Sequence, residues 1–262
     1  MLIGSIRDRS RVPVVMLFLG CAPLLFSANQ AQTHVFEPAG TEAASALVMA
    51  FVGGFVHSND LRHSEVQLAQ HLQAAFGEGV QVRVFENRER SKAHKAIVEW
   101  RNGLETSPET GKKRPEPGII LFGHSWGASA VVYLARDLER DGIPVSRTIL
   151  VDSVRQSGED DSVIPANVAE AVNFYQSKGV IHGRSKIMAA DPARTAVLGN
   201  FRFEYEKEPA ECRAYPWYDR LFFKGHTSIE CDPRVWSQVE TLIVGRLAAR
   251  LQSEQPAVHL MP

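Results

Sequence analysis

Short apolar runs alternate along the chain with longer segments in which apolar residues recur every three or four positions. The runs at 46–52, 118–122 and 147–151 predict buried strands, because a parallel strand covered on both faces has few polar positions. Residues 80–85 alternate between apolar and polar, which predicts a strand with one wetter face. Residues 196–203 form a fifth candidate strand.

Apolar stripes at helical spacing predict helices between and after these strands. The predicted helices cover residues 65–76, 93–100, 128–140, 165–176 and a long final segment from Pro233. Asp232 directly precedes Pro233, and this pair is typical of a helix start. Strands that alternate with helices at this spacing predict an α/β fold, in which helices flank both faces of a mostly parallel sheet.

The composition is that of an ordinary globular protein. Of 262 residues, 44% are hydrophobic and 23% are charged, so the chain can bury one large core, and we expect a single domain over residues 32–262. A net charge of −1 argues against a surface that binds polyanions, and we therefore expect no nucleic-acid partner. The sequence leaves the oligomeric state open.

The amino terminus has the pattern of a secretory signal peptide. Three arginines in the first eleven residues precede an apolar run at 12–28, and small residues follow. We expect cleavage after Ala31, which removes residues 1–31 and leaves a secreted or periplasmic protein without stable membrane insertion. Two alternatives are an uncleaved anchor helix, although the run is shorter than the ~20 residues that span a bilayer, and a lipid on Cys21.

Removal of this signal also removes Cys21 and leaves Cys212 and Cys231. An even number of cysteines in an exported chain favours a disulfide, whose closed loop would stabilise the fold by roughly 3 kcal/mol. The alternative is a pair of free cysteines that are merely close in sequence.

The candidate chemistry centres on Ser125, in the sequence Gly123-His124-Ser125-Trp126-Gly127. This G-x-S-x-G pattern lies between a predicted buried strand and a predicted helix, which is the context of a nucleophile elbow. The glycines let the strand and helix backbones approach closely, and the serine hydroxyl then projects into a cleft. We expect Ser125 to be a nucleophile; the alternative is an ordinary glycine-rich turn.

A serine hydroxyl needs a base to take its proton and an acid to orient that base. In folds with this elbow the acid follows the serine along the chain and the histidine comes last. Three of the nine histidines lie well beyond the elbow: His182, His226 and His259. We expect His226 to be the base, because it directly precedes the final helix and lies inside the predicted disulfide loop. The alternative is a histidine in a surface loop.

Two carboxylates compete for the role of the acid. Asp152 continues the apolar run at 147–151, which places it at the carboxyl end of a strand, where the active site of a parallel sheet forms. Glu204 follows the last predicted strand and is the alternative. We favour Asp152, which otherwise would be a turn or helix-capping residue.

The oxyanion of a tetrahedral intermediate needs hydrogen-bond donors. The backbone N–H of Trp126 is one candidate, and the turn after the strand at 46–52 supplies the second, from Phe55 or, as the next choice, Gly54. Gly54, Trp217 and Phe222 are candidates to bind substrate, since aromatic residues near these turns would form an apolar acyl pocket. The alternative is that these aromatic residues pack against the sheet.

Metal-ligand spacing is weak in this chain. The nearest approach is His57 and His63 with Asp60 between them, which turn and helix-start chemistry explains better. We therefore expect no metal site and no cofactor.

Several segments resemble the α/β-hydrolase superfamily, in a small lipase-like or thioesterase-like bacterial branch. Beyond the elbow, the resemblance is carried by 151–153, 167–168 with 172–176, 226–229 and 232–233, and it covers roughly 46–251. It implies a catalytic acid after the strand that follows the elbow, which supports Asp152. The chain lacks the opening antiparallel strands and the long cap insertion of larger members.

The resemblance and the candidate residues together imply an exported serine esterase. Such an enzyme would cleave a small-molecule or lipid ester, or a thioester, of an apolar acid through an acyl-enzyme, using Ser125, Asp152 and His226. Two alternatives stay open: a binding protein that keeps the fold without catalysis, and an acyltransferase with the same triad.

Overall fold

The computed structural model describes residues 45–105, 118–156 and 158–254, which belong to one compact unit, Gly40–Pro262. The predicted signal peptide at 1–31, with Cys21, lies outside the described residues, as do His259 and the end of the chain from residue 255. Among the helices that the structure describes, none is both long and apolar enough to span a membrane.

Six parallel strands form the central sheet in the order β2-β1-β3-β4-β6-β8. They are β1 (Ala46–Val52), β2 (Val80–Glu86), β3 (Gly118–His124), β4 (Val145–Val151), β6 (Val168–Tyr175) and β8 (Ala196–Arg202). A separate pair of short parallel strands consists of β5 (Val163–Ile164) and β7 (Met188–Ala189). Every residue of β1 and β3 is buried, as expected for central strands covered on both faces.

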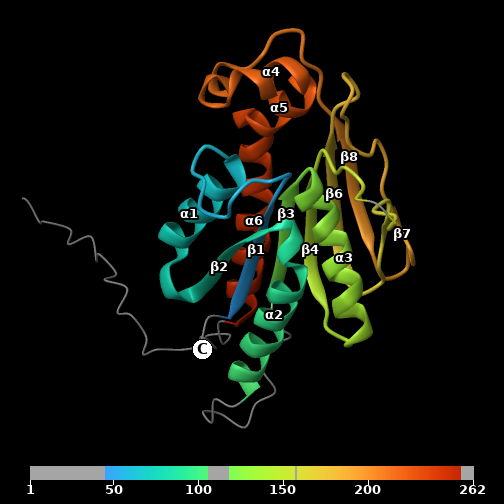
Figure 1. Cartoon of the computed structure of the whole chain (residues 1–262). Helices are drawn as coiled ribbons and strands as arrows, with labels where there is room; N and C mark the ends of the chain where they lie inside the picture. The colour runs from blue at the N-terminus through green and yellow to red at the C-terminus, as the bar shows by residue number, and fades with distance from the viewer. Residues whose placement is uncertain (1–44, 106–117, 157, 255–262) are drawn as a thin grey trace, which may run out of the picture. The chain divides into compact units, whose positions relative to one another are not determined.

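Helices cover both faces of this sheet. The longer ones are α1 (Ser64–Phe76), α2 (Arg90–Glu105), α3 (Trp126–Arg140) and α6 (Pro233–Glu254); the shorter ones are α4 (Trp217–Phe222), α5 (Lys224–Glu230) and the 3₁₀ turns η1 (Gly77–Gly79), η2 (Asn87–Glu89) and η3 (Ala210–Ala214). In Figure 1, α2 and α3 lie in front of the sheet and α6 lies behind it. The predicted α/β architecture is thereby confirmed.

Alternate residues of β1 enter two different cores. Leu47, Met49 and Phe51 pack in the core beneath α2 and α3. Val48 and Ala50 pack in the core shared with α1 and α6. Each fully buried large side chain stabilises the fold by about 1.5–3 kcal/mol, so both layers depend on the apolar pattern of the central strands.

The helix predicted over residues 165–176 is wrong, because this segment forms strand β6 between β4 and β8. β6 pairs with β4 without a register shift, and the register irregularity beside it is an extra residue, Leu198, on β8. Because β6 has buried residues on both faces, Val168, Ala171 and Val172 lie three and four positions apart, and this spacing imitates a helical stripe. Val172 and Phe174 are β-branched and aromatic residues buried in the sheet, as is typical of strands.

The carboxyl-terminal region differs in detail from the prediction. No helix was predicted between residues 177 and 232, yet this region contains α4, and His226 lies within α5. A disulfide joins Cys212 to Cys231, with Cα atoms 5.2 Å apart, which confirms the predicted bond. The predicted start of the final helix is also confirmed, since the Asp232 carboxylate accepts a hydrogen bond from the Arg234 N–H at 2.9 Å.

Because all six strands are parallel, their carboxyl ends meet at one edge of the sheet. Gly53 follows β1, Ser125 follows β3, Asp152 follows β4 and Gln176 follows β6. The segment with α4 and α5 lies beyond this edge, at the upper end in Figure 1. The topology therefore gathers residues that are far apart in sequence into one region.

Candidate active site

The turn that carries Ser125 has a strained backbone. Ser125 has φ 57° and ψ −126°, in a region that residues with a side chain rarely adopt. The strand and helix on either side come so close that a Cβ at Gly123 would lie 2.7 Å from the carbonyl carbon of Gly127, and a Cβ at Gly127 would lie 2.2 Å from the Phe51 carbonyl oxygen of the neighbouring strand β1. The turn thus has the geometry expected of a nucleophile elbow.

The side chains of Ser125, His226 and Asp152 form a continuous hydrogen-bonded row. His226 Nε2 lies 2.8 Å from Ser125 Oγ, and His226 Nδ1 lies 2.6 Å from Asp152 Oδ2. Since a carboxylate only accepts hydrogen bonds, the imidazole donates from Nδ1, which leaves Nε2 to accept the serine proton. This tautomer is the one that general-base catalysis requires.

Asp152 is completely buried and held by several donors. Its Oδ1 accepts hydrogen bonds from the backbone N–H groups of Gln176, at 3.1 Å, and Gly183, at 2.7 Å. Its Oδ2 accepts one from the Gln176 side chain at 3.0 Å. Burial alone would raise the pKa of Asp152, but the hydrogen bond and charge of His226 and the Gln176 donors outweigh it and lower that pKa. The carboxylate is therefore ionised at neutral pH.

The sequence did not single out Gln176 and Gly183 as supports of the acid. Gln176 comes directly after β6, which would have marked it as a residue at the edge of the sheet, but the helix predicted there concealed this position. The loop glycine carries no signal in the sequence. Its N–H reaches Asp152 only through the folding of a long connection.

The alternative acid and the alternative base lie elsewhere. Glu204 pairs with Arg202, at 3.0 Å between Oε1 and Nη2, and more than half of its side chain is exposed. His182 is exposed as well. The structure thus brings Asp152 and His226 to Ser125.

The turn after β1 lies directly against the candidate nucleophile. A Cβ at Gly53 would be only 2.8 Å from the Cβ of Ser125, so this close approach requires glycine. The Asn87 side chain donates a hydrogen bond to the Gly54 carbonyl at 2.5 Å and fixes the turn. The Phe55 ring packs edge-on against Trp126, with ring centroids 5.7 Å apart. Phe55 and Trp126, whose backbone N–H groups are the predicted oxyanion donors, therefore both lie beside Ser125.

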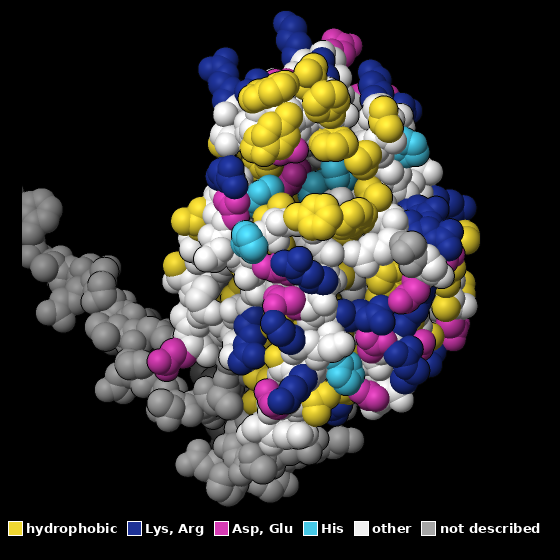
Figure 2. Space-filling view, in the orientation of Figure 1, with side chains coloured by type: hydrophobic (Ala, Val, Ile, Leu, Met, Phe, Trp, Pro, Cys, Tyr) yellow, Lys and Arg dark blue, Asp and Glu magenta, His cyan; other side chains and the backbone are white. Residues whose placement is uncertain are grey.

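A cleft of about 520 Å³ opens over Ser125 and His226. Gly54 lines it as predicted, together with Phe55, Trp126, Tyr218 and Phe223. Trp217 and Phe222, which the sequence analysis expected to bind substrate, are 68% and 63% exposed and do not line the cleft. Figure 2 shows hydrophobic side chains around a hollow in which histidine and acidic side chains are visible.

A second group of ionisable side chains lies beside this row: His63, Glu65, His124 and Glu230. The His124 ring packs against that of His226 at a tilt of 32°, with centroids 4.5 Å apart. Burial lowers the pKa of His124 to about 4, so this imidazole is neutral at pH 7.

The two carboxyl groups of this cluster have opposite pKa shifts. Burial and the nearby charge of Glu230 raise the pKa of Glu65 to about 8. Burial also acts to raise the pKa of Glu230, but His124 and His63 outweigh it and lower that pKa. Burial acts to lower the pKa of His63, but the hydrogen bond and charge of Glu230 outweigh it and raise that pKa. The sequence analysis missed this cluster.

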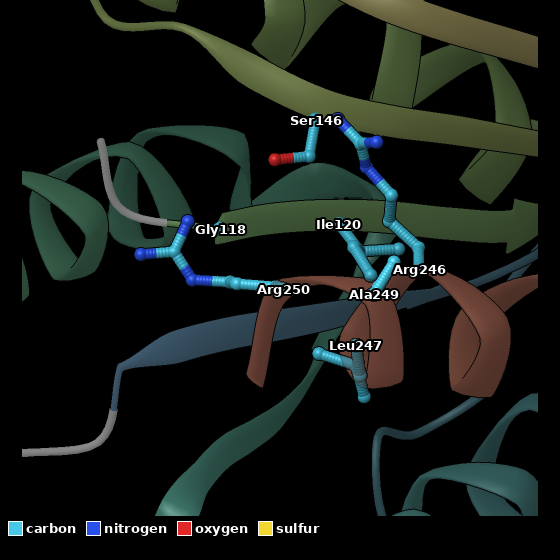
Figure 3. A pocket seen from close by; sticks show the side chains of 7 residues that line it. All are labelled: Gly118, Ile120, Ser146, Arg246, Leu247, Ala249 and Arg250. Carbon is cyan, nitrogen blue, oxygen red and sulfur yellow. The ribbon is translucent and has the colours of Figure 1, made fainter. Parts of the chain in front are cut away.

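A further hollow lies at the opposite edge of the sheet, beside the first residues of β3 and β4. Figure 3 shows its lining, in which Arg246 and Arg250 extend from α6 toward Ser146 and Gly118. The described residues that line it include neither a histidine nor a carboxylate. The hollow therefore lacks the acid–base groups found around Ser125.

No protein-family model matches the chain, and no curated protein is similar to it in sequence. Solved structures show a weak likeness. An arylesterase is 19% identical with a TM-score of 0.32, and the match covers 45% of this chain and 40% of that one. The RedJ thioesterase of prodiginine biosynthesis in Streptomyces coelicolor is 14% identical, with a TM-score of 0.40 and coverage of 76% and 91%. A cutinase-like protein from Cryptococcus sp. is 14% identical, with a TM-score of 0.38 and coverage of 80% and 98%.

The fold is therefore described from the strand order and side-chain contacts of the chain itself. A mostly parallel sheet, a serine turn after β3, an aspartate after β4 and a histidine near the final helix were predicted and are present, whereas β6 adds a sixth strand that was not predicted. The chain thus has an α/β fold in which the serine turn after β3 has the geometry of a nucleophile elbow, and serine, aspartate and histidine follow one another in that order along the chain.

Proposed function

We propose that the protein is a serine hydrolase that cleaves carboxylic esters or thioesters of apolar acids through an acyl-enzyme on Ser125. The observation that carries this proposal is the hydrogen bond of 2.8 Å between Ser125 Oγ and His226 Nε2, on a histidine whose other nitrogen lies 2.6 Å from the buried Asp152 carboxylate. A serine at a strained turn with a base and an orienting acid is the requirement for nucleophilic catalysis.

The reaction follows from these contacts. His226 Nε2 takes the proton of Ser125 Oγ as the oxygen attacks the ester carbonyl, and the carbon becomes tetrahedral. The protonated imidazole then gives its proton to the leaving alcohol or thiol, and the acyl group stays on Ser125. Water repeats the sequence with His226 as base and releases the acid. Asp152 keeps the imidazole in the required tautomer and stabilises its positive charge.

The negative oxygen of the tetrahedral intermediate requires donors beside Ser125. We assign this role to the backbone N–H groups of Trp126 and Phe55, since the turn that carries Phe55 lies against Ser125 and Asn87 holds it in place. Loss of one such donor typically slows the reaction by about 10²–10³-fold.

The cleft favours an uncharged, apolar acyl group. Among the described residues that line it, the one arginine is Arg62, whose Nε lies 2.9 Å from the Asp60 carboxylate. This pairing neutralises the cation, so the cleft offers no free positive charge to an anionic substrate. The aromatic side chains of Phe55, Tyr218 and Phe223 instead present apolar surface next to the candidate nucleophile.

A panel of p-nitrophenyl esters of graded chain length, with thioesters and peptides alongside, tests the proposal. We expect turnover of apolar acyl esters and its loss in Ser125→Ala and His226→Ala. The matched control is Ser146→Ala, which removes a hydroxyl at the opposite edge of the sheet and is expected to leave turnover unchanged. Unimpaired turnover by Ser125→Ala would end the proposal. Product analysis with an added alcohol acceptor separates hydrolysis from acyl transfer.

We also propose that the protein is exported after cleavage at Ala31. The disulfide between Cys212 and Cys231 supports this, because such bonds persist in oxidising compartments. Amino-terminal sequencing of protein recovered from outside the cytoplasm is expected to begin at Gln32.

A further inference from the structure

Four ionisable side chains from three separate segments converge beside His226. His63 and Glu65 come from the start of α1, His124 ends β3, and Glu230 ends α5. Potential ligand atoms of His63, Glu65 and Glu230 all lie within 4.8 Å of one another. The fourth side chain faces the same point, with His124 Nδ1 at 3.6 Å from Glu230 Oε2 and at 3.8 Å from Glu65 Oε1.

The polar atoms of this cluster are incompletely paired. Glu65 is fully buried, yet neither of its carboxyl oxygens has a hydrogen-bond partner. The backbone N–H groups of Gly53 and Glu65 are close to it, but neither meets the geometry of a hydrogen bond. A buried carboxylate without a partner is strongly unfavourable, and here a second carboxylate lies next to it. Glu230 already pairs with His63, and a metal ion among these atoms would supply the partner that Glu65 lacks.

We propose that His63, Glu65, Glu230 and His124 bind one Zn²⁺ ion. Zinc accepts imidazole nitrogen and carboxylate oxygen together in a tetrahedral arrangement, with bonds of about 2.0–2.2 Å. Ligand atoms in such a tetrahedron are about 3.4 Å apart, close to the 3.6 and 3.8 Å from His124 Nδ1 to the two carboxylates. Two imidazoles disfavour Ca²⁺ and Mg²⁺, which prefer oxygen ligands.

The surroundings of His63 suit a metal ligand. Its Nδ1 contacts Glu230 Oε1, and its Nε2 faces the Asp60 carboxylate at 3.8 Å. Asp60 is in turn held by Arg62. The Tyr215 ring packs edge-on against the imidazole, with centroids 5.2 Å apart. A carboxylate behind a histidine is the usual means of orienting a ligating imidazole.

Zinc at this position would act on the structure around the site and would take no part in the proposed hydrolysis. It would tie α1 to the ends of β3 and α5, next to Ser125 and one helical turn from His226. His63, His124 and Glu230 also line the cleft, which gives the ion a route from solvent. The expected effect is a more rigid and more stable catalytic region.

The spacing along the chain concealed this cluster. The sequence analysis paired His63 with His57 and Asp60 and expected no metal, whereas His57 pairs with Glu86 at 3.0 Å. The partners of His63 include Glu230, which lies 167 residues further along the chain. No motif with a fixed spacing reports such a site.

To test the proposal, the purified, oxidised protein is first stripped of metal with a chelator and then titrated with Zn²⁺. We expect calorimetry to give one Zn²⁺ per chain. Free zinc at about 100 times Kd should raise Tm by about 5–10 °C, because the ion binds the folded state. The disulfide keeps Cys212 and Cys231 from competing as thiolate ligands. If the chelated protein neither binds zinc nor changes its Tm, the proposal is overturned.

Conservative variants locate the ion. Glu65→Gln keeps the side-chain shape and removes the charge, and His63→Gln removes a ligand; each is expected to weaken zinc binding by at least about 100-fold. The control is His71→Gln, at an exposed histidine that pairs with Glu240 at 3.0 Å and should bind zinc as the unaltered protein does. Zinc binding that is unchanged in both ligand variants, or lost in His71→Gln, contradicts the assignment.

Discussion

The imidazole of His124 lies against that of His226 with ring centroids 4.5 Å apart, so the residue before the candidate nucleophile packs against the candidate base. Two charged imidazoles at this distance would repel each other. Burial keeps the pKa of His124 at about 4, and therefore only His226 gains a proton during the proposed reaction. The elbow thus supplies both the serine and one wall of the pocket that holds the base.

Asp152→Asn tests the role of the acid. The amide would present an N–H or a weaker acceptor to His226 Nδ1 and would no longer hold the tautomer whose Nε2 accepts the serine proton. We expect kcat for a p-nitrophenyl ester to fall by about 10⁴-fold. Glu204→Gln is the matched control and should leave kcat unchanged, because Glu204 pairs with Arg202. A large loss of kcat in Glu204→Gln, with none in Asp152→Asn, would show that Glu204 is the acid.

The acid dependence of stability follows from the lowered pKa of Asp152. Its folded pKa lies below the ordinary value of 3.8, so ionisation of this carboxylate stabilises the folded state above that value. This contribution is lost as pH falls through the folded pKa. We expect the difference in free energy of unfolding between the unaltered protein and Asp152→Asn to be full above about pH 5 and to shrink below pH 4. Urea unfolding across this range measures it, and a difference that grows on acidification would contradict the assigned direction.

Gln176→Met tests the support of the acid. Methionine has a similar length but donates no hydrogen bond, so Asp152 Oδ2 loses a donor at 3.0 Å while Gly183 still donates to Oδ1. A hydrogen bond to a charged group contributes about 1.5–3 kcal/mol, which corresponds to a fall in kcat of about 10- to 100-fold with little change in KM. Gln67→Met is the control, since Gln67 donates to the Leu61 carbonyl, away from this row. Equal kcat values in Gln176→Met and Gln67→Met would show that Gln176 does not support the acid.

The disulfide is expected to contribute to stability more than to chemistry. Cys212 and Cys231 close a loop across 19 positions that contains His226. The double variant Cys212→Ala with Cys231→Ala should lose about 3 kcal/mol of unfolding free energy and, once folded at low temperature, retain turnover. Unfolding in denaturant measures the loss. A reducing agent should lower the stability of the unaltered protein to the same extent and leave the double variant unaffected.

The three predicted residues that the structure brings together all have local signals. Ser125 and Asp152 directly follow apolar strands, and parallel topology then brings strand ends together without further information. His226 was found from its place before a capped helix and inside the disulfide loop. These features lie within a few residues of the side chains concerned.

The errors arose where distant segments decide the structure. Burial of β6 on both faces put apolar residues three and four positions apart, which made this strand look helical and concealed Gln176. Trp217 and Phe222 were assigned to the cleft from their aromatic character, but the way α4 lies on the surface turns Tyr218 toward it instead. The cluster of His63 and Glu230 depends on packing between the two ends of the domain, which sequence spacing does not encode.

Covalent labelling by a fluorophosphonate tests the central claim most directly, because the reagent reacts only with a serine that an adjacent base has activated. Peptide mass spectrometry of the labelled protein is expected to place one adduct on Ser125, and His226→Ala should label far more slowly. Labelling of another serine, or unchanged labelling in His226→Ala, would contradict the account.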